Sequence, residues 1–197
     1  MTEMIDFTAQ TRLVARLAER TADPQLDAPT PCGTYAVRHL LGHLVGLSAA
    51  FQDVARKELG PTTSTSPNAF RPDVEPGWRA ELDRNLAGMV TAWRAPEAWE
   101  GETQAGGVPL PGAVAGRIAL NELVLHGWDL ARATGQDYAP DEDSLAVSYA
   151  LLSSWSTPDG TSGGLFGTPV PVPEDAPLLD RVVGLGGRRP DWTPSAA

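Results

Sequence analysis

The sequence predicts an all-α protein built as an up-down four-helix bundle with a C-terminal extension. Four long stretches carry apolar side chains at intervals of three and four residues, which is the spacing of a buried helix face. Strand signal is limited to one short stretch around Val108. At 197 residues the chain fits one domain with its own core. We therefore expect a single domain, 1–197, in which 156–197 form an irregular extension containing one or two further helices.

The first two helices are expected over residues 2–21 and from the N-cap Thr34 to about Leu59. The apolar stripe of the first consists of Met4, Phe7, Val14, Leu17 and Ala18. That of the second consists of Val37, Leu40, Leu41, Leu44, Leu47, Phe51 and Val54. Residues 60–76 lack periodicity and are rich in Pro, Ser and Thr, so we expect a loop that borders a pocket.

The third and fourth helices are expected over residues 77–93 and 116–135. The third has a regular core stripe of Trp78, Leu82, Leu86, Met89 and Trp93. The fourth is apolar on most sides and ends at Gly135, which can adopt the left-handed stop conformation. A fifth helix over 141–155 and a short last helix over 176–185 complete the prediction.

Charge and composition exclude several classes of partner. The chain has 25 acidic and 15 basic residues, a formal charge of -10, so phosphate backbones and anionic membranes are repelled. No apolar run approaches the length of a membrane span, and the first residues do not read as a signal peptide. Cys32 is the only cysteine and has no partner for an internal disulfide. We expect a cytoplasmic protein without nucleic-acid or membrane partners.

Two histidine-containing pairs are the candidate functional residues. His39 and His43 lie four residues apart in the second helix, and so do Glu122 and His126 in the fourth, which places each pair on one helix face. A buried carboxylate is costly, and a divalent cation shared with His126 would offset that cost. In helix bundles, metal sites are built from facing helices. The other interpretation is that the histidines are core or surface residues and that Glu122 pairs with an arginine.

Three passages carry a resemblance to a known family. Residues 31–44 read PCGTYAVRHLLGHL, residues 121–135 read NELVLHGWDLARATG, and residues 178–194 read LLDRVVGLGGRRPDWTP. The chain resembles the DinB-like superfamily and, within it, the mycothiol-dependent maleylpyruvate isomerase type of metal-binding domain, including short actinobacterial metal-binding proteins. Tyr35 stands where that family has tryptophan, and the chain leaves no room for the isomerase's second domain.

The resemblance implies that His43, Glu122 and His126 bind a divalent metal, with zinc favoured and nickel as an alternative. Two imidazoles and one carboxylate suit such an ion, and three protein ligands leave one coordination position open. In the isomerase this position takes the thiolate of a small-molecule cofactor. The implied function is a thiol-dependent transferase or isomerase that acts on a small molecule and uses a low-molecular-weight thiol such as mycothiol.

A non-catalytic metal-binding or structural helical module is the alternative. In that case a fourth protein ligand such as His39 would close the metal site. Hydrolysis by metal-bound water ranks lower, because no general base stands out once Glu122 is a ligand. We expect a small-molecule substrate or thiol as the partner, and a homodimer is compatible with the sequence.

Four further residues lie outside the two pairs and have more than one possible role or a minor one. Asp129 can accept the free imidazole N–H of His126, or it can pair with an arginine such as Arg117 or Arg132, or anchor a loop. Cys32 is expected to serve packing rather than redox chemistry. The neighbouring Arg188 and Arg189 either bind an acidic substrate or pair with acids at the surface, and the second is expected.

Overall fold

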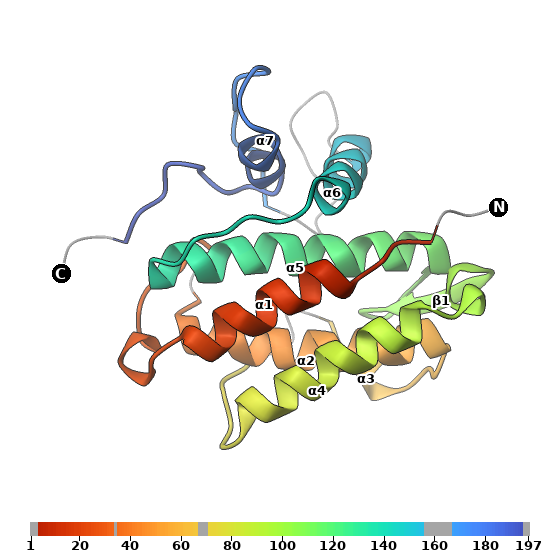
Figure 1. The fold of residues 1–197 in the computed structure, drawn as a ribbon. Helices are drawn as coiled ribbons and strands as arrows, with labels where there is room; N and C mark the ends of the chain where they lie inside the picture. The colour runs from red at the N-terminus through yellow and green to blue at the C-terminus, as the bar shows by residue number, and fades with distance from the viewer. Residues whose placement is uncertain (1–3, 34, 67–70, 156–166, 195–197) are drawn as a thin grey trace.

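The chain is mostly helical, with one small hairpin (Figure 1). The computed structural model describes residues 4–33, 35–66, 71–155 and 167–194. Its helices are α1 (Thr8–Arg20), α2 (Val37–Arg56), α3 (Pro61–Ser64), α4 (Trp78–Trp93), α5 (Gly112–Thr134), α6 (Glu142–Trp155) and α7 (Leu178–Leu185). Two 3₁₀ turns, η1 (Asp23–Gln25) and η2 (Pro96–Trp99), and strands β1 (Glu102–Ala105) and β2 (Val108–Pro111) complete it. Within these ranges, no helix is both long enough and apolar enough to cross a membrane.

Helix α5 lies at the centre of the molecule. It packs against α1 and α2, and each of these also contacts α4. On the other side of α5 lie α6 and α7, which pack against each other (Figure 1). Because neighbours cover α5 on both sides, most of its residues are buried, as its nearly continuous apolar sequence predicts. A polar side chain on α5 therefore requires a partner inside the protein.

Three helix starts differ from the prediction, and one of them is that of α5, which begins at Gly112 rather than residue 116. Helix α1 begins at Thr8 rather than residue 2, because the Asp6 carboxylate accepts hydrogen bonds from the Thr8 backbone N–H and hydroxyl. Met4, predicted on the core stripe, is 51% exposed. Helix α2 begins at Val37, and the predicted N-cap Thr34 lies outside the described residues.

Helix α2 also ends earlier than predicted, because Lys57 adopts the left-handed conformation at φ 59°. Helices α4, α6 and α7 begin within two residues of the predicted starts, and Gly135 ends α5 at φ 69° as expected. Part of the predicted C-terminal extension, 156–166, lies outside the described residues.

The stretch around Val108, where the sequence indicated at most a short strand, forms an antiparallel hairpin. Strand β1 pairs with β2 so that Ala105 faces Val108. Gly106 and Gly107 form the turn at φ 60° and 82°, and two consecutive positive φ values are typical of a tight hairpin turn. The hairpin contacts α2, α3 and α5.

The predicted stripe on α4 is core, and it ends in an aromatic cluster. The Trp93 ring stacks on Phe7 with ring centroids 5.7 Å apart, and its edge meets Trp99 at 5.0 Å. Gly116 of α5 lies against both indoles, since a Cβ atom there would come within 2.5 Å of Trp99 and 2.9 Å of Trp93. This close approach fixes the hairpin end of α5 against α4 and η2.

Two segments outside the long helices lie next to the metal-ligand candidates. The loop that follows α3 passes over α2, where a Cβ atom on Gly42 would come within 2.6 Å of the Asp73 carbonyl oxygen. Gly42 directly precedes His43. The turn after α7 lies against α5, where a Cβ atom on Gly186 would come within 2.7 Å of Leu125. The two segments thus approach α2 and α5 beside the predicted ligands.

Candidate metal centre

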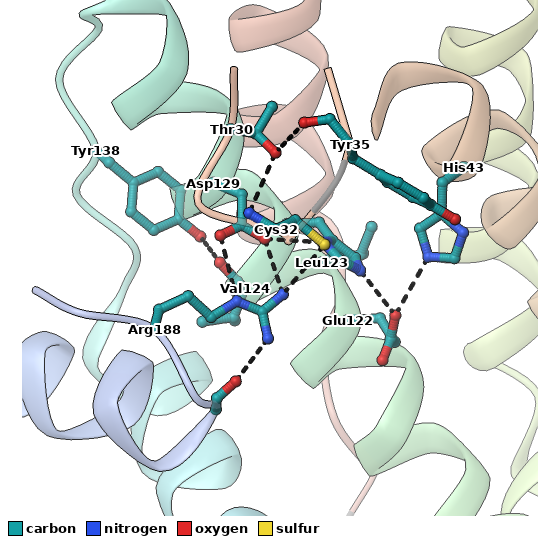
Figure 2. A network of polar contacts seen from close by, with 12 residues as sticks. Thr30, Cys32, Tyr35, His43, Glu122, Leu123, Val124, Asp129, Tyr138 and Arg188 are labelled. Carbon is teal, nitrogen blue, oxygen red and sulfur yellow. Dashed lines mark hydrogen bonds and ion pairs between the residues drawn. The ribbon is translucent and has the colours of Figure 1, made fainter. Parts of the chain in front are cut away.

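The structure brings His43 of α2 together with Glu122 and His126 of α5. One carboxylate oxygen, Glu122 Oε2, lies 3.5 Å from His43 Nε2 and 3.2 Å from His126 Nε2 (Figure 2). One donor atom from each residue falls within 4.8 Å of the other two. The side chains of His43, Glu122 and His126 are 17%, 18% and 9% exposed. The three predicted ligands therefore form one mostly buried cluster.

Packing and local helix geometry together create this cluster. Glu122 and His126 lie on one face of α5 because residues four apart on a helix point the same way. That face meets α2, with which α5 is in contact, and His43 points across the contact. The His43 and His126 rings meet edge to face with centroids 4.8 Å apart.

Glu122 carries its charge inside the protein. Burial alone would raise the pKa of this carboxyl, but hydrogen bonds from His126 and His43 hold the pKa below its ordinary value. Burial alone would lower the pKa of His126. Hydrogen bonds to Asp129, Cys32 and Glu122 instead raise the pKa of His126 well above its ordinary value. The cluster thus pairs a buried anion with an imidazole that binds a proton strongly when no metal is present.

Asp129 is the partner of His126 on the side away from Glu122. Its carboxylate is fully buried, and Oδ2 lies 3.0 Å from His126 Nδ1. Arg188 donates to both oxygens of Asp129, at 2.8 Å through Nη2 and 3.2 Å through Nε. Asp129 therefore contacts His126, as one alternative predicted, and the arginine that pairs with it is Arg188, whereas Arg132 donates to the Trp192 carbonyl oxygen.

The prediction for the two C-terminal arginines was right for one and wrong for the other. Arg189 pairs at the surface with Asp191, at 2.9 Å. Arg188 instead lies inside the protein, with a side chain 10% exposed, bound to Asp129. The sequence signal that could have indicated this pairing is the place of Asp129 within the apolar stretch of α5. Such a position is buried, and a buried carboxylate needs a compensating charge. Which arginine supplies the charge is not encoded in any local spacing.

Cys32 and His39 lie beside the cluster in different ways. Cys32 Sγ is 3.8 Å from Arg188 Nη2, and Cys32, His126 and Asp129 form a second group of convergent donors. The Arg188 guanidinium already neutralises the Asp129 carboxylate of that second group. His39 lies outside both groups found among the described residues, and its Nδ1 accepts the Ala36 N–H at the start of α2.

The pKa shift of His126 predicts opposite pH dependences for folding and for metal binding. Because the pKa is raised in the folded state, protonated His126 stabilises the metal-free protein below the ordinary value of 6.5. That contribution is lost as pH rises through the raised pKa. Zinc binding requires the neutral imidazole, so zinc affinity should rise with pH by up to about tenfold per unit for one displaced proton.

Zinc titrations against a competing chelator, between about pH 6 and 9, test this prediction alongside chemical unfolding in EDTA. The lowered pKa values of Glu122 and Asp129 keep both carboxylates ionised over this range. A zinc affinity that does not change with pH would contradict the assignment of His126 as a ligand that must lose a proton.

Comparison with known proteins identifies the family. The sequence profile described as Mycothiol maleylpyruvate isomerase N-terminal domain matches residues 7–131. The chain belongs to this family. The matched region runs from the start of α1 into the last turn of α5, so it includes His43, Glu122, His126 and Asp129. The family resemblance inferred from the sequence is thereby confirmed.

Two sequence relatives and two solved structures match most of the chain. Uncharacterized proteins of two Mycobacterium tuberculosis strains, CDC 1551 / Oshkosh and ATCC 25618 / H37Rv, are each 31% identical over 195 residues, covering 91% of this chain and 93% of theirs. Two crystal structures of a mycothiol-dependent maleylpyruvate isomerase, one of them a histidine-to-alanine mutant, superpose with TM-scores of 0.57 and 0.61. They are 17% identical and cover 80% of this chain and 71% of theirs, which establishes a shared fold.

Proposed function

We propose that His43, Glu122 and His126 bind a divalent metal, zinc in preference to nickel, in a thiol-dependent transferase or isomerase that acts on a small molecule. The observation that carries the proposal is the convergence of two imidazole nitrogens and one carboxylate oxygen within 4.8 Å. In the up-down bundle that we propose for the four long helices, such sites lie between facing helices.

The donor set fits zinc. Nitrogen and oxygen ligands of this kind are those that zinc takes in proteins. Asp129 occupies the Nδ1 side of His126, so Nε2 is the nitrogen left to face Glu122 and His43. A bound metal would also account for the buried charge of Glu122, because a dication compensates a carboxylate more fully than the two imidazoles do.

The number of ligands supports catalysis over a purely structural role. Among the described residues, no further His, Cys, Asp or Glu completes the cluster as a fourth ligand. Three protein ligands leave a position for an exogenous group. A zinc ion with an open position of this kind would keep a thiol bound there deprotonated and nucleophilic near neutral pH. The solved relatives are described as mycothiol-dependent, and we propose a thiol of that type here.

Metal content of the untagged protein, measured by plasma mass spectrometry, tests the proposal. We expect about one equivalent of zinc in the parent and its loss in His43→Ala and His126→Ala. His39→Ala is the matched control, because His39 lies one turn before His43 on α2 but outside the cluster. It should keep the metal, although losing its contact with the Ala36 N–H weakens the start of α2.

The outcomes separate the candidate functions. A parent without metal, even after reconstitution, would contradict the metal site. A metal-loaded parent that shows no calorimetric binding of mycothiol would favour the alternative, a non-catalytic metal-binding module. Mycothiol binding that disappears with the metal in His43→Ala would support thiol-dependent chemistry.

A further inference from the structure

The Arg188 side chain is largely buried beside the candidate metal centre, with 10% of it exposed, and it has contacts on several sides. Besides the two hydrogen bonds to Asp129, Nη1 donates to the Gly186 carbonyl oxygen at 2.6 Å. Nη2 also lies near Cys32 Sγ (Figure 2). Burial lowers the pKa of this guanidinium and Asp129 raises it, with a net rise, so the group stays charged. A planar donor held at this many points has little freedom to turn.

The backbone that carries Arg188 is also fixed in place. In the turn after α7, the Arg188 backbone N–H donates a hydrogen bond to the Val183 carbonyl oxygen of that helix, at 2.9 Å. Gly187 adopts φ 81° in this turn, and Gly186 lies against Leu125 of α5. Leu125 directly precedes His126. The C-terminal turn therefore delivers Arg188 to the same turn of α5 that carries the ligand.

A continuous chain of polar contacts then runs from Arg188 to the ligand cluster. Arg188 holds both oxygens of Asp129, Oδ2 of Asp129 meets His126 Nδ1, and His126 Nε2 faces Glu122. Each contact restricts the rotation of the next side chain. Partners of this kind orient metal-binding histidines and select the nitrogen that faces the metal.

We propose that Arg188 is a positioning residue for His126 and acts through Asp129, so that the C-terminal segment completes the metal centre. The inference rests on the proposed metal site, but it concerns a residue beyond the region 7–131 that the family profile matches. Its chemical basis is the two-point contact, because a carboxylate gripped at both oxygens cannot rotate away from the imidazole.

Zinc affinity of the full-length, untagged chain tests the proposal through the variants Arg188→Met, Asp129→Asn and the double variant. Loss of an outer partner of a ligand typically weakens metal affinity by about 10- to 100-fold, and we expect this for each single variant. Since Arg188 acts through Asp129, the double variant should be no more than about threefold weaker than Asp129→Asn. Arg189→Met is the matched control, because Arg189 is adjacent in sequence but exposed.

Three further measurements separate positioning from general stability. Cobalt(II) replacing zinc should show a visible spectrum that changes in Arg188→Met and not in Arg189→Met. Thermal unfolding of the metal-free variants identifies those that fail to fold. Arg188→Lys keeps the charge but not the planar fork, so it should recover only part of the affinity lost in Arg188→Met.

Several results would overturn the proposal. One is a zinc affinity that is unchanged in folded Arg188→Lys or Arg188→Met. Another is a double variant whose loss of zinc affinity equals the product of the two single losses. A third is a loss of zinc affinity in Arg189→Met as large as that in Arg188→Met. If the parent binds no metal, the proposed function fails, but the positioning can still be tested by NMR.

The measured quantity is the rate at which the proton on His126 Nδ1 exchanges with solvent. This exchange should be slow in the parent and in Arg189→Met and rapid in Arg188→Lys, and equal exchange rates would contradict the inference.

Discussion

Replacing Glu122 by glutamine is expected to weaken zinc binding by at least about 100-fold while leaving the helical fold intact. Structural zinc sites with four ligands bind with about 10–16 kcal/mol, so one ligand contributes about 3 kcal/mol, which corresponds to about 100-fold. Glutamine keeps the shape of the side chain but removes the one negative charge shared by the two histidines. The measurement is a competition titration with a zinc chelator at constant pH.

Glu102→Gln provides the matched control for this experiment. Glu102 is exposed at the start of β1, so the same chemical change there should leave zinc affinity unaltered. The pKa of His126 should also fall in Glu122→Gln, because Glu122 is one of the groups that raise it. Zinc affinity equal to the parent's in Glu122→Gln would show that the carboxylate is not a ligand.

Replacing Trp93 by alanine is expected to lower the free energy of unfolding by about 3–5 kcal/mol. Trp93 is 1% exposed and packs between Phe7 and Trp99, with Gly116 of α5 against its ring. Removing the indole leaves a cavity where α1, α4 and α5 meet, and the rigid neighbouring rings cannot collapse into it. Urea unfolding followed by circular dichroism measures the loss.

Trp93→Phe separates the packing of the ring from its polar atom. Trp93 Nε1 is buried and has no hydrogen-bond partner among the described residues. An unpaired buried donor costs about 1–3 kcal/mol, so its removal offsets part of the lost volume, and Trp93→Phe should be clearly milder than Trp93→Ala. Leu59→Ala, at a position 59% exposed, should change stability by less than about 0.5 kcal/mol. If Trp93→Ala lowered the free energy of unfolding by no more than Leu59→Ala does, the assignment of Trp93 to the core would be contradicted.

Local rules allowed much of this protein to be predicted from its sequence. Spacings of three and four residues identified the long helices, including the core stripe that ends at Trp93. The same rule placed Glu122 and His126 on one face of α5. Helix starts were less predictable, because side chains such as Asp6 compete for the first N–H groups. The hairpin was also missed as a pair, since its strands are four residues long and the signal in each is weak.

The metal-ligand candidates show where local information ends. The two pairs on α2 and α5 can be read from spacing, but spacing does not say whether the two faces meet. Packing of α2 on α5 decides that His43 reaches Glu122, while His39 lies outside the cluster and contacts the start of its own helix. The choice between His39 and His43 is therefore made by the angle at which the helices pack, which is a property of the whole core.

The sequence by itself determined the helical class of the protein, its core stripes and the residue types able to bind a metal, because these depend on neighbours within one helix turn. Only the tertiary structure decided that Arg188 neutralises Asp129 and that Asp129 contacts His126. Arg188 and Asp129 lie 59 residues apart in the chain. A buried carboxylate requires some cation, but which cation it receives depends on where the chain returns after α7.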